Sequence, residues 1–304
     1  MNYTLHQLQV FLKVAELGSV SKAAESMHLS QPAISMQLRK LQDQFALPLT
    51  EIVGRQLYLT EFGQEIAAAA RPILEQVHAI NYKTLAYQGQ LTGQLRIMSV
   101  STGKYIIPYL LSDFLYRNPG IELQYQVTNK QQVIAALEQN SIDLALVSLL
   151  PTHLSLDKME LLPNELRLVA SPLLLERAET QHWQALLQRQ PLLFRESGSG
   201  TRQLMEAWLA AQGWSQPHRF ELGSNEAVKQ AVLAGLGCSV MPVLGIKGEL
   251  ERGEMVVIEA PGLPLFGEWS LVHAKGKRLL PAAQAFLDFM KRERDSIHKR
   301  WFSK

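Results

Sequence analysis

Apolar residues recur at helical spacing in three short runs along the first 45 residues. In the first run, the apolar positions that share one helical face are Leu5, Leu8, Phe11, Leu12 and Ala15. Gly18 is typical of a helix end, and Ser19 or Ser21 can cap a second helix that holds Ala23 and Ala24. These small residues allow the second helix to approach a third one closely.

The third run covers residues 30–45 and carries two different faces. Ser30 can cap this helix, and its apolar stripe consists of Ile34, Leu38, Leu41 and Phe45. At about 100° per residue, the other side presents Pro32, Ser35, Met36 and Arg39. Two short helices, a tight link and a third helix of this kind predict a helix-turn-helix, whose outer face suits a DNA major groove. An ordinary surface helix has the same pattern, so the rest of the chain must decide between them.

Alternating positions over 47–60 predict a two-stranded wing with Gly54 at its turn. Arg55 then lies at the wing tip, within reach of a phosphate or a minor groove. From 61 to about 88 a long helical pattern follows, in which Ile66, Ile73, Ile80 and Tyr87 recur every seven residues. A heptad seam predicts pairing with a second copy of the helix, and packing on its own domain is the alternative. Pro72 inside the helix predicts a bend.

Strand and helix patterns alternate beyond residue 94. We expect strands at 95–101, 121–128, 143–148, 192–195, 219–223, 238–242 and 267–274, and helices at 105–120, 131–139, 201–212, 225–235 and 281–297. Residues 160–167 are expected to form a connection. This order predicts an α/β fold with a mostly parallel sheet, in two similar halves that are joined by two crossovers and enclose a ligand cleft.

Composition limits the possible classes of function but does not identify one of them. A chain of 304 residues holds two or three domains, and its net charge is +2. Residues 1–60 carry five cations and four acids, so DNA binding must rest on the placement of charge. The single cysteine, Cys238, allows no intrachain disulfide and is interpreted as a small buried side chain. Without a signal-peptide pattern or an apolar run of about 20 residues, we predict a cytoplasmic protein with no membrane partner.

At the N-terminus the stretches FLKVAELGSVSKAAESMHLSQPAISMQLRKLQ and LYLTEFG resemble the LysR-type transcriptional regulators, and the resemblance covers essentially the whole chain. Within that family, SQPAISMQL, VSTGKY, FRESGSGTR and SNEAVKQAV are most similar to regulators of Calvin-cycle (RuBisCO) operons. The resemblance implies a winged helix-turn-helix at 1–60, a dimerising linker helix at 61–92 and an effector domain at 93–304 that resembles periplasmic binding proteins. Its subdomain I would span about 93–163 and 268–304, and subdomain II about 164–267.

The same resemblance implies partners and DNA-contact residues. The partners are double-stranded promoter DNA, a small-molecule effector, RNA polymerase and further copies of the chain, in a homodimer or a homotetramer. The implied DNA contacts are Gln31, Pro32, Ser35, Arg39 and Arg55. Met36 stands where many family members carry Arg, so its base contact would be apolar, for example with a thymine methyl. Thr50 replaces the usual aromatic residue at the base of the wing.

Polar residues gather where the predicted strands end and helices begin. These candidate effector contacts are Ser101, Thr102, Thr128, Asn129, Ser199, Thr201, Arg202 and Asn225. Hydroxyls, helix N-termini and one guanidinium suit a small anion. The resemblance independently places the effector pocket here and implies phosphorylated sugars, phosphoglycerate-like acids or NADPH as effectors. Each Ser or Thr can equally be a helix cap.

Two other classes of function remain alternatives. An enzyme that acts on a phosphorylated metabolite is one, but Gly198-Ser199-Gly200 lacks the spacing of a nucleophile elbow and the eight histidines lack metal-ligand spacing. A solute-binding protein fits residues 93–304 and leaves 1–60 unexplained. We therefore predict a regulator rather than an enzyme, with no metal and no cofactor. The tail at 291–304 holds six cations and two acids and is interpreted as a solvated helix end, with contact to DNA or an acidic partner as the alternative.

Overall fold

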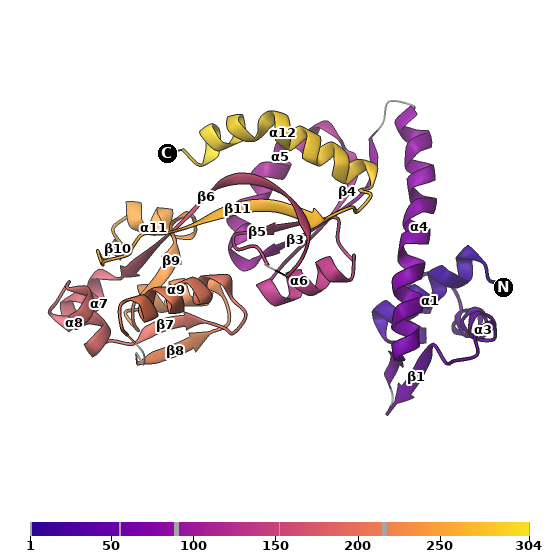
Figure 1. The fold of residues 1–304 in the computed structure, drawn as a ribbon, viewed down its shortest axis with the longest axis horizontal. Coiled ribbons are helices and arrows are strands. Elements are labelled where there is room, and N and C mark those ends of the chain that lie inside the picture. The colour runs from indigo at the N-terminus through magenta and orange to yellow at the C-terminus, as the bar shows by residue number, and fades with distance from the viewer. Residues whose placement is uncertain (1, 55, 88–90, 152, 215–217, 304) are drawn as a thin grey trace. The chain divides into compact units, whose positions relative to one another are not determined.

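The computed structural model describes residues 2–54, 56–87, 91–151, 153–214 and 218–303, with the backbone alone at 75, 78–79 and 81–87. It divides into two compact units, Met1–Leu91 and Thr92–Lys304 (Figure 1). Each unit is described by itself.

The first unit is a winged helix-turn-helix followed by a long helix. Its elements are α1 (Leu5–Leu17), α2 (Val20–Ser26), α3 (Gln31–Gln42), β1 (Thr50–Val53), β2 (Gln56–Leu59) and α4 (Glu61–Tyr87). Thr4 and Gln7 form a capping box at α1, while the side chains of Ser19 and Ser30 cap α2 and α3. The helix-turn-helix and wing predicted from the sequence are confirmed.

Helix α1 is buried on two sides, whereas the sequence pattern predicted a single apolar stripe. Leu8 and Phe11 pack with Leu41 beside α4. Val10 and Val14 pack on α2 and are fully buried, whereas Leu5 is 44% exposed. A helix in the middle of a three-helix unit contacts neighbours on two faces, so its apolar stripe is wider than the one expected of a surface helix.

Helix α4 is one continuous helix through Pro72 (Figure 1). The predicted bend stays a prediction. Ala67, Ala70 and Leu74 face the core of the unit. On other positions of α4, Ile73 is 45% and Ile80 is 65% exposed in the single chain. The helix therefore packs on its own unit along one side and presents large apolar side chains on another.

The second unit is built on a seven-stranded mixed sheet. Its elements are β3 (Thr92–Val100), η1 (Ser101–Tyr105), α5 (Ile107–Arg117), β4 (Gly120–Thr128), α6 (Lys130–Glu138), β5 (Leu144–Val147), β6 (Leu156–Ala170), α7 (Pro172–Ala178), α8 (Trp183–Arg189), β7 (Leu192–Arg195), α9 (Gly200–Ala211), β8 (Arg219–Leu222), α10 (Asn225–Leu233), β9 (Ser239–Pro242), η2 (Val243–Gly245), α11 (Lys247–Glu251), β10 (Val256–Val257), β11 (Leu265–Ala274) and α12 (Pro281–Trp301). The strand order is β10-β6-β11-β5-β3-β4, and β9 pairs with β6.

Long strands make the sheet less parallel than predicted. Strand β3 pairs in parallel with β4 and β5, and β7 with β8. The long strands β6 and β11 run antiparallel to each other, and β11 also runs antiparallel to β5. The connection predicted at 160–167 is wrong, because these residues lie inside β6. Pro163 and the charged residues around it hid the strand from a search for apolar runs.

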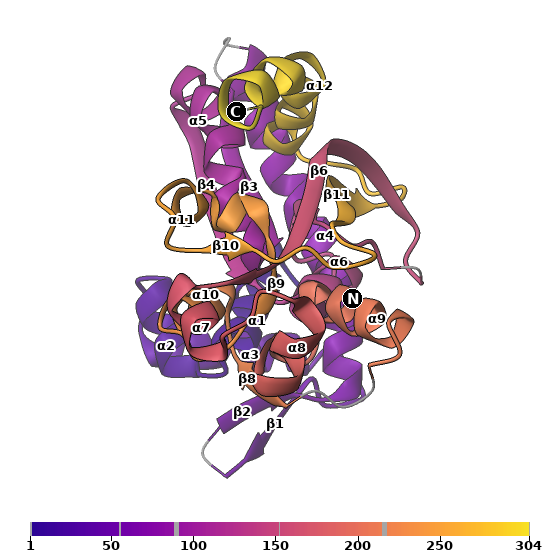
Figure 2. The same ribbon diagram turned by 90° about the vertical axis from the view of Figure 1, so that its left-hand side faces the viewer.

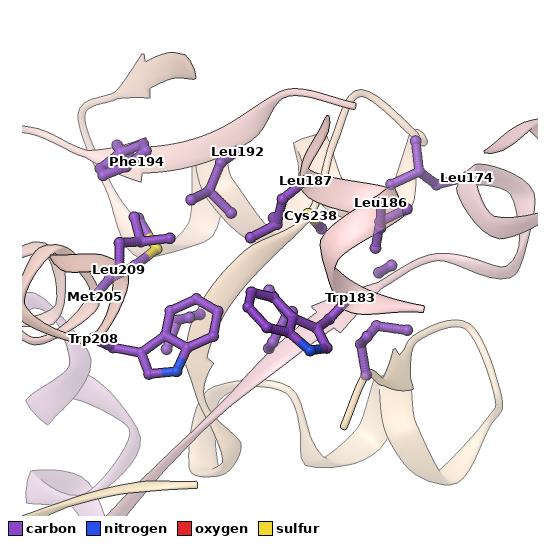
Figure 3. Close-up of a cluster of buried hydrophobic side chains, with 14 of the residues drawn as sticks. Leu174, Trp183, Leu186, Leu187, Leu192, Phe194, Met205, Trp208, Leu209 and Cys238 are labelled. Atoms are coloured by element: carbon purple, nitrogen blue, oxygen red, sulfur yellow. The ribbon is translucent and has the colours of Figure 1, made fainter. Parts of the chain in front are cut away.

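Separate groups of buried side chains fill the two halves that these long strands join. In one half, α12 and α5 lie side by side (Figure 2), where Phe114 contacts Phe286 and Phe289. In the other half, a cluster around Trp183 and Trp208 packs between α8, α9 and β7 (Figure 3). Cys238 belongs to this second cluster and is fully buried, as predicted. Burial raises the pKa of its thiol to about 12.

Candidate DNA-recognition face and effector cleft

Helix α3 presents the predicted DNA-recognition residues to solvent. Pro32, Ser35, Met36 and Arg39 are all exposed, while Ile34 on the opposite side is fully buried. Met36 is 52% exposed, so its side chain is accessible for an apolar contact. The two sides of this helix therefore separate as the spacing predicts, and its outer face is available for contact.

Of the two other DNA-contact candidates of the first unit, Gln31 lies at the start of α3. The Oε1 atom of Gln31 accepts a hydrogen bond from Ser21 Oγ at 3.3 Å, which ties the start of α3 to α2. Gly54 follows β1 with a φ of +67°, a conformation that favours glycine, so the wing turns where the sequence predicts. Arg55 falls outside the described residues. Thr50 is half-buried at the start of β1.

A small cavity lies between the two halves of the second unit. Its volume is about 20 Å³, and it is lined by Val100, Ser101, Thr102, Asn129, Lys130, Ser148, Leu149, Arg195, Ser199, Gly200 and Thr201. Five of the predicted effector contacts are therefore brought together, from segments that lie about 100 residues apart in the sequence. A volume of this size holds about one water molecule.

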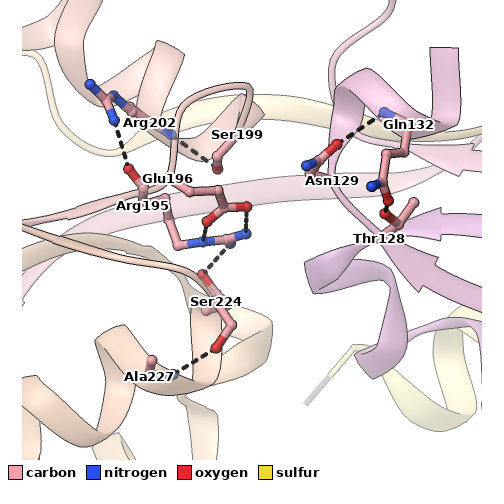
Figure 4. A network of polar contacts seen from close by, with 10 residues as sticks. Thr128, Asn129, Gln132, Arg195, Glu196, Ser199, Arg202, Ser224 and Ala227 are labelled. Carbon is pink, nitrogen blue, oxygen red and sulfur yellow. Dashed lines mark hydrogen bonds and ion pairs between the residues drawn. The ribbon is translucent and has the colours of Figure 1, made fainter. Parts of the chain in front are cut away.

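Helix starts surround this cavity, and their capping residues are already bonded (Figure 4). Asn129 Oδ1 accepts from the backbone N–H of Gln132 at 2.9 Å and caps α6. Ser199 Oγ accepts from the backbone N–H of Arg202 at 3.5 Å and caps α9. Both side chains therefore act as helix caps. The Ser199 hydroxyl still has its own proton to donate.

Two polar atoms near the cleft are buried and have no hydrogen-bond partner among the described residues. They are Ser101 Oγ at the start of η1 and Asn225 Nδ2 at the start of α10. A buried polar atom without a partner costs about 1–3 kcal/mol, so such atoms mark places where a ligand or water completes the site. Asn225 is 1% exposed, and its other amide atom, Oδ1, accepts from Arg195 Nη1 at 3.4 Å.

Arg195 is the central cation of the cleft, and it is absent from the residues predicted as contacts. It ends β7, and its side chain is 5% exposed. Nε and Nη2 each donate to the carboxylate of Glu196 at 2.7 Å (Figure 4). The signal in the sequence was an Arg that follows three apolar residues of a buried strand, because such a position is seldom cationic without a polar role.

Arg202 does not line the first cavity, although Ser199, Gly200 and Thr201 just before it do. Its guanidinium donates to Glu206 at 2.8 Å, to Glu221 at 2.7 Å and to the backbone oxygen of Arg195 at 3.1 Å. The hydrogen bond to Glu206 is the largest cause that raises the pKa of Arg202. The side chain lines a second, more open cavity of about 420 Å³, which shares Lys130 and Ser199 with the first.

Two remaining candidates do not line the first cavity. The Thr128 hydroxyl donates to the side-chain oxygen of Gln132. Asn225 lies behind Arg195, which it contacts through Oδ1. Lys130, at the start of α6, does line both cavities and donates to Gln203 Oε1 of the opposite half at 3.2 Å. Desolvation lowers the pKa of Lys130.

Polar contacts also tie the two halves together beside the cleft. The Tyr105 hydroxyl donates to Glu226 Oε2 at 3.3 Å, and Lys104 Nζ lies 3.8 Å from the same oxygen. Burial is the main cause that raises the pKa of Tyr105. The end of η1 in one half is thus connected to the start of α10 in the other.

Other classes of site find no support in the part of the chain that the structure describes. No group of His, Cys, Asp and Glu side chains there is arranged to hold a metal ion. None of the helices described has the length and apolar character needed to cross a membrane. Cations of the C-terminal tail contact their own domain, as Arg294 Nη1 donates to the Glu160 backbone oxygen at 3.0 Å.

Comparison with known families decides between the remaining classes of function. Residues 5–64 match the family described as "Bacterial regulatory helix-turn-helix protein, lysR family", and residues 88–295 match "LysR substrate binding domain". The chain belongs to the LysR family of transcriptional regulators. It is therefore a DNA-binding regulator of transcription with an effector-binding domain, which excludes a free solute-binding protein and an enzyme.

Curated members of the LysR family are similar over nearly the full length. The chain is 39% identical to a "RuBisCO operon transcriptional regulator" of Allochromatium vinosum over 303 residues, 99% of each chain. It is 37% identical to the "HTH-type transcriptional activator CmpR" of Synechocystis over 292 residues, 95% of each chain. The resemblance to regulators of RuBisCO operons is thereby confirmed.

Solved structures of LysR proteins share the fold. The Synechocystis CcmR regulatory domain in complex with 2-PG is 30% identical, with a TM-score of 0.59, and the match covers 70% of this chain and 99% of that one. Full-length CbnR complexed with its target DNA has a TM-score of 0.65 over 95% of this chain and 99% of that one. At 22% identity, the second comparison supports the fold alone.

Proposed function

We propose that this LysR regulator senses a small anionic metabolite in the cleft of its second unit and changes its action on promoter DNA in response. The observation that carries the proposal is the buried Arg195 at a cavity whose described lining contains no carboxylate. A guanidinium has five N–H donors, and among the described residues Arg195 uses three of them, two toward Glu196 and one toward Asn225. Two donors therefore remain for a ligand.

Several further groups favour a carboxylate or a phosphate at this place. Ser101 Oγ is buried and has no hydrogen-bond partner in the described part of the chain, and Lys130 lies across the cleft from α9. The starts of α6 and α9 add backbone N–H groups and the positive ends of two helix dipoles. All of these groups donate hydrogen bonds or attract negative charge.

The cavity is too small for a metabolite in the arrangement described, since about 20 Å³ holds about one water molecule. Binding therefore requires the halves to separate or rotate, toward the neighbouring cavity of about 420 Å³. A ligand that prefers one arrangement shifts the population toward it, and this shift is the proposed signal to the DNA-binding heads.

The comparisons favour one class of effector. The CcmR regulatory domain was solved with 2-PG, and similar proteins are named as regulators of RuBisCO operons. We infer an effector related to 2-PG and a target operon of carbon fixation. Ser101, Thr102, Thr128, Asn129, Ser199, Thr201, Arg202 and Asn225 are kept as effector contacts or neighbours, with Arg195 and Lys130 added.

The first unit supplies the proposed DNA contacts. Gln31, Pro32, Ser35, Met36 and Arg39 would meet the major groove, and Arg55 would meet the backbone or minor groove from the wing. The exposed Ile73 and Ile80 of α4 support dimerisation through this helix. Residues 1–60, 61–92 and 93–304 then act as DNA-binding, linker and effector regions. Because its target is promoter DNA, we place the protein in the cytoplasm.

Titration of the full chain with 2-PG tests the effector part of this proposal. We expect calorimetric binding, and we expect 2-PG to alter the footprint or the bend angle on the DNA upstream of the gene. Arg195→Gln should weaken binding by about 100-fold, because a hydrogen-bonded charge pair is worth about 1.5–3 kcal/mol. Arg252→Gln removes an arginine that is also paired with a glutamate, at 2.8 Å, and serves as the matched control. Binding that is equal in both variants would contradict the proposed site.

A further inference from the structure

Glu196 occupies the edge of the Arg195 guanidinium that offers Nε and Nη2, an edge that a bidentate anion could also use, although Glu196 is absent from the cavity lining. Its carboxylate bonds Arg195 Nε and Nη2 at 2.7 Å each, in a two-pronged geometry that matches a carboxylate or phosphate ligand (Figure 4). Arg195 therefore has its charge neutralised in the ligand-free chain. A buried cation without such a partner would be strongly destabilising.

The two partners differ in their freedom to move. The Arg195 side chain is 5% exposed and is held by Asn225 at 3.4 Å, so it is fixed in the interior. The Glu196 side chain is 22% exposed and starts the turn that leads to Ser199 and α9. Its carboxylate can turn to solvent at a small cost in desolvation, whereas the guanidinium cannot.

We propose that Glu196 is a built-in counter-ion that an anionic effector displaces from Arg195, and that this exchange sets the affinity and charge selectivity of the cleft. The inference rests on the proposed anionic effector and names a residue that regulates the same site. Glu196 keeps Arg195 paired in the empty state and repels a second anion that approaches the same guanidinium. Neutral metabolites gain nothing from displacing it.

This exchange predicts opposite effects of one substitution on stability and on affinity. Glu196→Gln keeps the size of the side chain and removes its charge. We expect the ligand-free variant to have a lower melting temperature, because Arg195 loses its counter-ion. We expect the same variant to bind 2-PG at least about tenfold more tightly, because repulsion between two carboxylate-like charges near one guanidinium is removed.

A purely structural role of Glu196 predicts a different result, in which both stability and affinity fall. Glu254→Gln is the matched control, since Glu254 also pairs with an arginine close in sequence, at 2.8 Å, and lies outside the cleft. It should leave the dissociation constant for 2-PG unchanged. Glu196→Asp keeps the charge on a shorter side chain, and we expect its affinity to lie between those of the wild type and Glu196→Gln.

Calorimetric titration of the full-length protein with 2-PG and thermal unfolding without ligand measure both quantities. Tighter binding by Glu196→Gln together with lower ligand-free stability supports the exchange. Unchanged or weaker binding by a folded Glu196→Gln overturns it while the anion site stands. If the wild type and all variants bind no 2-PG, the proposed effector class fails first and the exchange falls with it. Should Glu196→Gln not fold, Glu196→Asp decides, and binding no tighter than the wild type's overturns the exchange.

Discussion

On α3, the side chains proposed to contact DNA are exposed, with Ser35, Met36 and Arg39 directed away from a buried stripe. Around the cleft, several polar side chains bond within the chain, as Arg195 does with the Glu196 carboxylate and Asn129 with the backbone N–H of Gln132. One surface is thus complete before its partner arrives. In the proposed mechanism the other must exchange internal bonds for ligand bonds and enlarge a cavity of about 20 Å³.

The difference follows from what each surface has to do. An exposed recognition helix displaces water and counterions when it meets DNA, so its affinity depends on exposed groups and on salt. An effector cleft must report that it is filled, which requires two arrangements of different stability. Hydrogen bonds between side chains of the cleft stabilise the ligand-free arrangement, which is the alternative to the ligand-bound one. From this contrast we expect that single substitutions on α3 change the affinity for DNA directly. Substitutions in the cleft should instead change effector affinity by altering the relative stability of the ligand-free and ligand-bound arrangements.

The largest effect is expected at Arg39. Arg39→Ala should abolish specific binding of the DNA upstream of the gene, because a bidentate contact to guanine carries about 1–3 kcal/mol of discrimination and a phosphate contact fixes the register. Lys40→Ala is the matched control, as Lys40 is an exposed cation on the same helix but lies about 100° from Arg39. Mobility shifts measure both variants, and size-exclusion chromatography should show unchanged assembly. An unchanged footprint of Arg39→Ala would remove it from the recognition face.

Next in size is the effect of charge on the linker helix. Ile73→Glu should raise the dissociation constant of the dimer at least about 100-fold, because an isolated carboxylate is costly in an apolar seam. Ala68→Glu introduces the same charge at an exposed position on another side of α4 and should leave the dimer intact. Sedimentation velocity distinguishes monomer from dimer. Equal behaviour of the two variants contradicts dimerisation along this seam.

A smaller and more informative effect is expected at the unpaired hydroxyl of Ser101. Ser101→Ala should leave ligand-free stability unchanged or slightly higher, since the lost Oγ has no partner among the described residues. It should weaken 2-PG binding by about tenfold. Ser239 Oγ is also buried and donates to the Leu193 backbone oxygen at 2.7 Å. Ser239→Ala should therefore lower stability by about 1 kcal/mol without changing affinity, and a reversal of these two results would exclude Ser101 as a ligand contact.

The smallest effect on function is expected at Cys238. Its thiol has a pKa raised from 9.0 to about 12, so the folded chain keeps the proton that the unfolded chain loses above pH 9. The resulting stabilisation is fully present below pH 9 and is lost as pH rises toward 12, with a slope of about 1.4 kcal/mol per pH unit. Urea unfolding at pH 8 and pH 10, compared with Cys238→Ala, measures this slope. Rapid reaction of the folded chain with a thiol reagent would contradict the burial.

Much of the first unit could be predicted from sequence because its order is local. Caps such as Ser30 and the stripe with Ile34 act within one or two turns of helix, and the structure reproduces both. The width of the α1 core could not be predicted, since Val10 and Val14 are buried by neighbours that the chain reaches later. In the second unit, β6 was missed because its half-exposed, charged positions gain their pairing from β11, about 100 residues away.

In the candidate sites, too, some features depend on neighbouring residues and others on segments that are distant in the chain. Sequence alone determined the exposed face of α3 and the helix starts that surround the cleft, because spacing and capping are properties of neighbouring residues. Tertiary structure decided which arginine lies at the cavity. Arg202 pairs with Glu206 and Glu221, whereas Arg195 lines the cavity with Glu196 as its partner. The physical reason is that the effective charge of an arginine depends on its burial and on its partners, and both are set by contacts between segments distant in the chain.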